Sequence, residues 1–106
     1  MSLSTHVLDA MSGRPAAGVA VTLTDAAGTT LATASTDDDG RIATLGDALA
    51  AGVYHLTFDT GGYFARRDVP TFYPEVVIAF HVTDALGKYH VPVLLSPFAY
   101  STYRGS

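Results

Sequence analysis

The stretch Gly52–Phe58, with the sequence GVYHLTF, alternates large apolar side chains with smaller or more polar ones. Tyr54, Leu56 and Phe58 fall on one face of an extended chain, and the residues between them fall on the other. This two-residue period is typical of a half-buried β-strand, because successive side chains of a strand point to opposite sides. The stretch therefore predicts a strand with one apolar face.

The same alternation recurs on both sides of this stretch and predicts further strands. A first strand begins at His6, in the segment before the first Gly of the chain. The other predicted strands are short, are separated by Gly, Pro or Asp, and cover residues 19–24, 31–36, 75–83, 89–96 and 100–103.

Turn and helix signals fill the spaces between these strands. Residues 36–40, TDDDG, have the chemistry of a turn, since Asp side chains bind the local backbone and Gly accepts a positive φ. Residues 45–51 predict a loop with at most one helical turn. A brief helix, the only one expected, covers residues 61–67 after Thr60. Pro92 lies inside a predicted strand and predicts a bulge or an edge position there.

These elements predict an all-β fold, a two-sheet antiparallel β-sandwich with one short helix. The 106 residues make one domain, residues 1–106. The chain has no Cys, which excludes a disulfide scaffold and a Cys-ligated zinc site. Its six basic residues are scattered among ten acidic ones, so we expect no nucleic-acid partner.

The sequence also bears on membranes and on location. No run approaches eighteen apolar residues, and the opening residues lack a basic segment followed by an apolar one. We therefore expect a soluble protein of the cytoplasm, with no membrane association and no export.

The four His are candidate functional residues, because imidazole titrates near neutral pH, with a reference pKa of about 6.5. His55 and His81 alternate with apolar residues on predicted strands, which favours structural roles. His6 and His90 stand among polar neighbours and are the better candidates. No H-x-H pair or H-E-x-x-H motif is present, so we expect no metal site.

Two charged features look structural on pattern alone. Asp37, Asp38 and Asp39 lack the spacing of a calcium loop, so a solvated turn is the better interpretation. Arg41 directly follows that turn, and a lone Arg in such a place usually belongs to the surface.

Particular residues, however, carry a resemblance that spans the whole chain. The segments are LSTHVLD, GRPA, YHVP, LLSP and YSTYRGS, at residues 3–9, 13–16, 89–92, 94–97 and 100–106. Together they resemble the 5-hydroxyisourate hydrolases, the transthyretin-related family of urate breakdown. The most specific part is YRGS at residues 103–106, which separates these hydrolases from the hormone-carrying transthyretins. Lys88 departs from the family pattern, since many members have His there.

The resemblance implies a fold, an assembly and a reaction. The fold is the transthyretin (prealbumin) type of sandwich, and the assembly is a homotetramer, a dimer of dimers with active sites in the channel between dimers. The reaction is hydrolysis of 5-hydroxyisourate to 2-oxo-4-hydroxy-4-carboxy-5-ureidoimidazoline, with no metal or organic cofactor. The implied catalytic residues are His6, Arg41, His90 and Ser106, whose terminal carboxylate is also implicated. The implied substrate-binding residues are His6, Arg41, Tyr103, Arg104 and Gly105.

The chemistry of the reaction suggests roles for these groups. One of His6 and His90 activates water and the other holds it or passes a proton onward, and the sequence leaves open which is the base. Arg41 stabilises the negative charge that develops on the substrate. Two other classes stay open: a transthyretin-like carrier of small ligands, against which the YRGS tail argues, and a structural prealbumin-like domain, which would need neither His.

Overall fold

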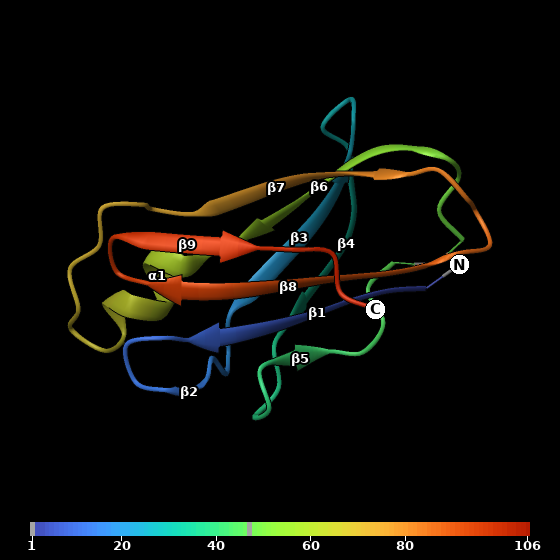
Figure 1. Cartoon of the computed structure of the whole chain (residues 1–106). Coiled ribbons are helices and arrows are strands. Elements are labelled where there is room, and N and C mark those ends of the chain that lie inside the picture. The colour runs from blue at the N-terminus through green and yellow to red at the C-terminus, as the bar shows by residue number, and fades with distance from the viewer. Residues whose placement is uncertain (1, 47) are drawn as a thin grey trace.

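A computed structural model of the chain describes residues 2–46 and 48–106. Two β-sheets pack face to face, with one short helix at one end (Figure 1). The elements are β1 (Ser2–Asp9), β2 (Arg14–Pro15), β3 (Ala20–Asp25), β4 (Thr30–Ser35), β5 (Arg41–Ile42), β6 (Gly52–Phe58), α1 (Thr60–Ala65), β7 (Val76–Val82), β8 (Lys88–Ser96) and β9 (Ala99–Thr102). One sheet has the order β2-β1-β8-β9, with β5 also paired to β1, and the other has the order β4-β3-β6-β7.

The core lies between the two sheets. Tyr54, Leu56 and Phe58 of β6 are all buried, as the alternation of this strand predicts. They pack in one apolar cluster with residues of the opposite sheet, among them Leu3 and Val7 of β1. Each sheet hides one face in this way, and the predicted sandwich is confirmed.

One pair of strands runs parallel, which the sequence pattern did not indicate. β1 and β8 pair in parallel along their whole shared length, while the other strand pairs are antiparallel. Ser4 stands directly opposite His90, and His6 stands opposite Pro92. Because side chains alternate along each strand, the outward residues of β1 lie beside the outward residues of β8.

Two expectations about these strands were wrong in detail. His6 lies in the middle of β1, since the strand already begins at Ser2. Pro92 lies neither at a bulge nor on an edge strand, because β8 runs between β1 and β9 in regular register. On the side of β8 that faces β9 and the C-terminal segment, Pro92 has no paired residue. It lies between two paired positions, the bridge His90–Gly105 and the pair Val93–Thr102. A residue without an N–H fits such a gap.

The helix forms close to where it was expected, but a different residue caps it. Asp59, not Thr60, is the N-cap, and its carboxylate accepts a hydrogen bond of 3.0 Å from the N–H of Gly62. The helix ends at Ala65, two residues earlier than expected, and Asp68 soon after it has a φ of 58°. It is the single helix within residues 2–46 and 48–106, and it is too short to cross a membrane.

The predicted loop over residues 45–51 contains no helix or strand in its described part, residues 45–46 and 48–51, and Asp47 lies outside the described residues.

A buried hydrogen bond ties the helix to the end of β1. The hydroxyl of Tyr63 donates to the carboxylate of Asp9 over 2.8 Å, and both residues are buried. Burial alone would raise the pKa of Asp9, but hydrogen bonds from Tyr63, Ser12 and Met11 outweigh it and lower the pKa below 3.8. Burial and the Asp9 carboxylate raise the pKa of Tyr63 to about 12. The pair therefore stabilises the fold when Asp9 is ionised.

We predict that Tyr63→Phe lowers the free energy of unfolding by about 1–3 kcal/mol near neutral pH, because an ionised buried acceptor loses its donor. A carboxyl with a lowered pKa contributes stability above its unfolded pKa, and that stability is lost as the pH falls. The difference between wild type and Tyr63→Phe should therefore shrink below about pH 4. Urea unfolding of both proteins, at neutral pH and below about pH 4, measures this difference in the free energy of unfolding.

The matched control is Tyr54→Phe, which removes a neutral hydrogen bond of 2.7 Å to the carbonyl of Ala50. Its loss of about 0.5–1.5 kcal/mol should be the same at both pH values. Equal pH dependence in the two variants would show that Tyr63 does not stabilise an ionised Asp9.

Candidate active site

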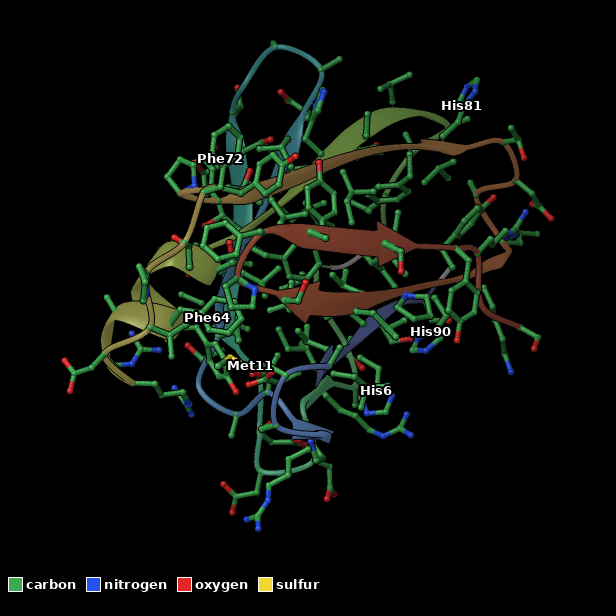
Figure 2. The ribbon with its side chains drawn as sticks, turned by 60° about the vertical axis from the view of Figure 1, so that its left-hand side comes forward. His6, Met11, Phe64, Phe72, His81 and His90 are labelled. Atoms are coloured by element: carbon green, nitrogen blue, oxygen red, sulfur yellow. The ribbon has the colours of Figure 1, made fainter. Side chains whose placement is uncertain are left out.

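The outward face of the first sheet brings together the main polar candidates. His6 on β1 pairs with Arg41 on β5, and His90 on β8 pairs with Ser4 on β1. Both imidazoles project from the same side of the sheet (Figure 2). His6 and His90 are half-buried and Arg41 is exposed. Three of the predicted site residues thus come from three neighbouring strands.

The Asp-rich turn places Arg41 on this face. One carboxylate oxygen of Asp37 accepts hydrogen bonds of 2.9 Å from the N–H groups of Asp39 and Arg41. Gly40 has a φ of 76°, and its carbonyl accepts from the N–H of Val7 over 2.7 Å. A Cβ at this position would overlap the carbonyl oxygen of Val7, so only Gly fits. The solvated turn is confirmed, and it holds β5 against β1.

A hollow of about 270 Å³ opens beside His90. Arg41 and Ser106 line it with His90, although they are far apart in the sequence. Ser4 and Lys88 line it as well, and neither was among the predicted site residues. Their positions on β1 and β8, each two residues before a candidate His, were the sequence signal that could have identified them.

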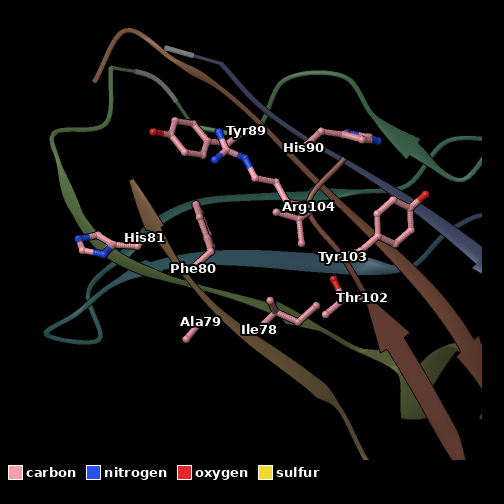
Figure 3. Close-up of a pocket in the computed structure, with 10 residues that line it drawn as sticks. Ile78, Ala79, Phe80, His81, Tyr89, His90, Thr102, Tyr103 and Arg104 are labelled. Carbon is pink, nitrogen blue, oxygen red and sulfur yellow. The ribbon is translucent and has the colours of Figure 1, made fainter. Parts of the chain in front are cut away.

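A second hollow, of about 260 Å³, lies on another side of His90 (Figure 3). Tyr103 and Arg104 line it together with side chains of β7, among them Phe80. The guanidinium of Arg104 lies 4.9 Å from the centre of the Tyr89 ring, and it donates to the carbonyl of Lys88 over 3.3 Å. Of the predicted substrate-binding residues, Arg41 therefore lines the first hollow and Tyr103 and Arg104 line the second, while His6 and Gly105 line neither.

The backbone of Gly105 pairs with that of His90. Its N–H donates to the His90 carbonyl over 2.9 Å, and the two residues form an isolated antiparallel bridge. A Cβ on Gly105 would overlap Cδ2 of the imidazole and lie 3.2 Å from Cγ of Pro92. Gly105 therefore contributes a close-packed backbone under the His90 ring.

The His90 ring is held at one nitrogen and lies in a positive environment. Its Nδ1 lies 2.8 Å from the hydroxyl oxygen of Ser4. Burial lowers the pKa of His90 below 6.5, and the positive charge of Arg41 and the nearby His6 lower it further, while a hydrogen bond to the backbone of Ser4 acts in the opposite direction. The neutral imidazole is consequently the favoured form at neutral pH.

His6 is held differently. Its Nε2 lies 2.9 Å from the backbone carbonyl of Asp39, and a carbonyl oxygen can only accept a hydrogen bond. Nε2 of His6 therefore carries a proton. His6 does not line the hollow that contains Arg41, His90 and Ser106. The two imidazoles are consequently not equivalent.

The remaining His residues lie outside this group. His55 is half-buried on β6, and His81 is exposed on β7 at the rim of the second hollow. In residues 2–46 and 48–106, no group of three or more His, Cys, Asp or Glu side chains is arranged to hold a metal ion.

We predict that Gly105→Ala displaces the imidazole of His90, since the added methyl group overlaps it. In a ¹H–¹³C NMR spectrum the His90 ring signals should move, while those of His55 stay in place. Gly28→Ala is the control: its φ of 87° makes the substitution strained, but no atom lies within 4 Å of its Cβ. Unmoved His90 signals in Gly105→Ala would contradict the packing described here.

Comparison with known proteins supplies the family. The model of the HIUase/Transthyretin family matches residues 3–105. A 5-hydroxyisourate hydrolase of Salmonella typhi is 48% identical over 109 residues, which cover 98% of this chain and 80% of that protein. A 5-hydroxyisourate hydrolase of Pseudomonas aeruginosa is 42% identical over 114 residues, covering 98% of this chain and 90% of that one.

Solved structures agree with this result. The 5-hydroxyisourate hydrolase of Klebsiella pneumoniae superposes with a TM-score of 0.93 at 45% identity, over 100% of both chains. Transthyretin from Sparus aurata superposes with a TM-score of 0.91 at 34% identity, over 98% of this chain and 96% of that one. The chain described here belongs to the HIUase/Transthyretin family.

Proposed function

We propose that this chain hydrolyses 5-hydroxyisourate to 2-oxo-4-hydroxy-4-carboxy-5-ureidoimidazoline, a step of urate breakdown. The observation that carries the proposal is that His90 and Arg41 line one hollow, with the second imidazole, of His6, paired to Arg41 across the sheet. A base and a fixed positive charge facing the same space suit water attack on a polar ring. The relatives named as 5-hydroxyisourate hydrolases support the same reaction.

The alternative of a small-ligand carrier has less support, although the fold alone does not separate the two. Both a hydrolase and a transthyretin superpose closely on this chain, but the hydrolase is the more similar in sequence. A carrier of an apolar aromatic ligand would place apolar side chains in the hollow. Arg41, Lys88 and His90 stand there instead.

We assign the general base to His90. It lines the hollow, and burial and the charge of Arg41 lower its pKa, so it is unprotonated at neutral pH. A well-placed general base contributes about 10²–10⁴-fold in rate. His6 has its Nε2 committed to the Asp39 carbonyl, which leaves Nδ1 to accept a hydrogen bond. We therefore give His6 the supporting role of holding water or substrate.

Arg41 acts as the electrostatic partner. Its guanidinium stays protonated at neutral pH and therefore cannot act as the base. It donates to substrate oxygens on which negative charge develops, and a donor of this kind contributes about 10²–10³-fold.

The reaction then balances with these groups alone. Nε2 of His90 takes a proton from water as the oxygen of that water forms a bond to the ring carbonyl carbon. The carbon–nitrogen bond of the ring breaks, and the departing nitrogen receives the proton from Nε2. The product carries the new carboxyl group, and His90 returns to its neutral form. No metal or organic cofactor is used in this scheme, so turnover should be unchanged by a chelator.

The C-terminal segment completes the site in this proposal. Tyr103 and Arg104 bind the ring from the second hollow, and Gly105 supports the imidazole through its backbone. Ser106 lines the first hollow together with His90 and Arg41 and contacts the substrate there. Positioning of this kind raises the rate by keeping the reacting groups in line.

We further propose that the chain works as a homotetramer in the cytoplasm. Tyr103 is 60% exposed, and Arg41 and Ser106 are also exposed, so the site of one chain is open to solvent. Another copy packed against this face would exclude water from it. Light scattering after gel filtration should give four times the 11.1 kDa mass of the chain. A mass of one chain with full activity would overturn the tetramer.

We predict that His90→Asn keeps the fold and loses most turnover, by about 10²–10⁴-fold. The loss of absorbance of freshly made 5-hydroxyisourate measures the rate. Because the pKa of His90 is lowered, wild-type kcat should remain high below pH 6.5 and fall only at more acidic pH. His55→Asn, on β6 and away from both hollows, is the control and should keep its activity. Near-normal turnover in His90→Asn would refute the assignment.

A further inference from the structure

Ser4 occupies a position on the outward face that the reaction scheme above does not use. It lies in register with His90 in the β1–β8 pairing and lines the same hollow as Arg41. Its hydroxyl oxygen is 2.8 Å from Nδ1 of His90, and the side chain is half-buried. Ser4 is thus the direct neighbour of the base on the adjacent strand.

The hydrogen bond to Ser4 is the one side-chain hydrogen bond that the His90 ring makes with residues 2–46 and 48–106. A neutral imidazole carries its proton on either Nδ1 or Nε2, and the partner of one nitrogen decides which. The Ser4 hydroxyl can donate or accept. Its orientation therefore decides whether Nε2 of His90 is a base or a donor.

Among the described residues, no Asp or Glu side chain lines either hollow to fix the tautomer of His90 in place of Ser4. The charged and titratable side chains around the ring come from β1, β5, β7, β8 and the C-terminal segment, and they are His6, Arg41, His81, Lys88, Tyr89, Tyr103 and Arg104. Ser106, whose terminal carboxylate the family resemblance implicates, lines the first hollow as well. A neutral hydroxyl thus stands where many catalytic His residues have a carboxylate.

We propose that Ser4 is a positioning residue for His90, whose hydroxyl accepts a hydrogen bond from Nδ1–H and so keeps the lone pair of Nε2 available to water. The inference rests on the proposed function, in which His90 is the base. If Ser4 donated instead, Nε2 would carry the proton and could not take one from water. The imidazolium formed in the reaction has a proton on both nitrogens, so the accepting orientation serves both states.

The choice of Ser over an acidic residue has a chemical consequence. A carboxylate beside Nδ1 would stabilise the imidazolium and raise the pKa of His90. A hydroxyl fixes the same tautomer without adding negative charge. His90 beside Arg41 therefore stays unprotonated at neutral pH. A carboxylate at position 4 would instead favour the protonated imidazole.

The neighbouring residue Thr5 offers a matched control on the same strand. Its hydroxyl donates to the carbonyl of Val91 over 2.6 Å on the buried side of the β1–β8 pair. Thr5→Val removes a hydrogen bond between the same two strands but leaves the outward face unchanged. It should lower stability without altering the tautomer of His90.

The test combines ¹⁵N NMR of the His90 ring with kinetics. We expect wild type to show a protonated Nδ1 and an unprotonated Nε2, and Ser4→Ala to show a mixture of tautomers. In Ser4→Ala, kcat should fall about 10–100-fold with little change in KM, as for other partners that orient a ring. Ser4→Thr keeps the hydroxyl and should restore both the tautomer and most of kcat. In Ser4→Asp, the acidic limb of the kcat profile should move to higher pH.

The outcomes separate the inference from the function on which it rests. An unchanged His90 tautomer in Ser4→Ala, or the same loss of kcat in Thr5→Val as in Ser4→Ala, would overturn the role of Ser4. Undiminished turnover in His90→Asn would overturn the proposed base itself, whatever the spectra of the Ser4 variants show.

Discussion

The parallel pairing of β1 with β8 is the constraint on which the rest of this site depends. It sets Ser4 beside His90 and brings His6 to the same outward face. β5 then adds Arg41 next to His6, and the backbone of Gly105 joins His90 from the other side. A shift of one residue in this register would turn the outward residues of β1 into the core, where Leu3, Thr5 and Val7 now pack. The apolar core therefore also fixes the arrangement of the polar site.

The two imidazoles of the face differ because their partners differ. His6 faces a backbone carbonyl, which leaves one protonation pattern for the neutral ring. His90 faces a hydroxyl, which permits two, and burial and the charge of Arg41 lower its pKa. The same residue type thus supplies a fixed donor at one position and a tunable base at the other. The hydrogen-bond partners of the two rings, rather than the imidazoles themselves, thus account for the different roles proposed for His6 and His90.

Much of the sandwich could be predicted from local pattern, because alternation and burial are coupled within each strand. The stretch Gly52–Phe58 gave the strand and its buried face correctly, and the Asp-rich turn before Arg41 was predicted for the right physical reason. The parallel partner of β1 was not predictable, since no local pattern records which strand lies alongside. The helix cap was missed for a smaller reason: Asp59 and Thr60 are both good caps, and only the hydrogen bond from the N–H of Gly62 to the Asp59 carboxylate distinguishes them. The spacing of Ser4 from His6 places it on the outward face, but its hydrogen bond to His90, 86 residues away, could not be predicted from local pattern.

That separation along the chain has a consequence for how the molecule assembles. β1 is synthesised early in the chain. Its partner β8 is synthesised only after β3 and β6, the two central strands of the opposite sheet. Contacts between such distant segments form slowly, because the intervening chain must first give up its freedom to bring them together. Until then the edge of β1 stays open and can pair with strands of other nascent chains. The polar face on which chemistry is proposed should accordingly be among the last parts of the protein to become ordered.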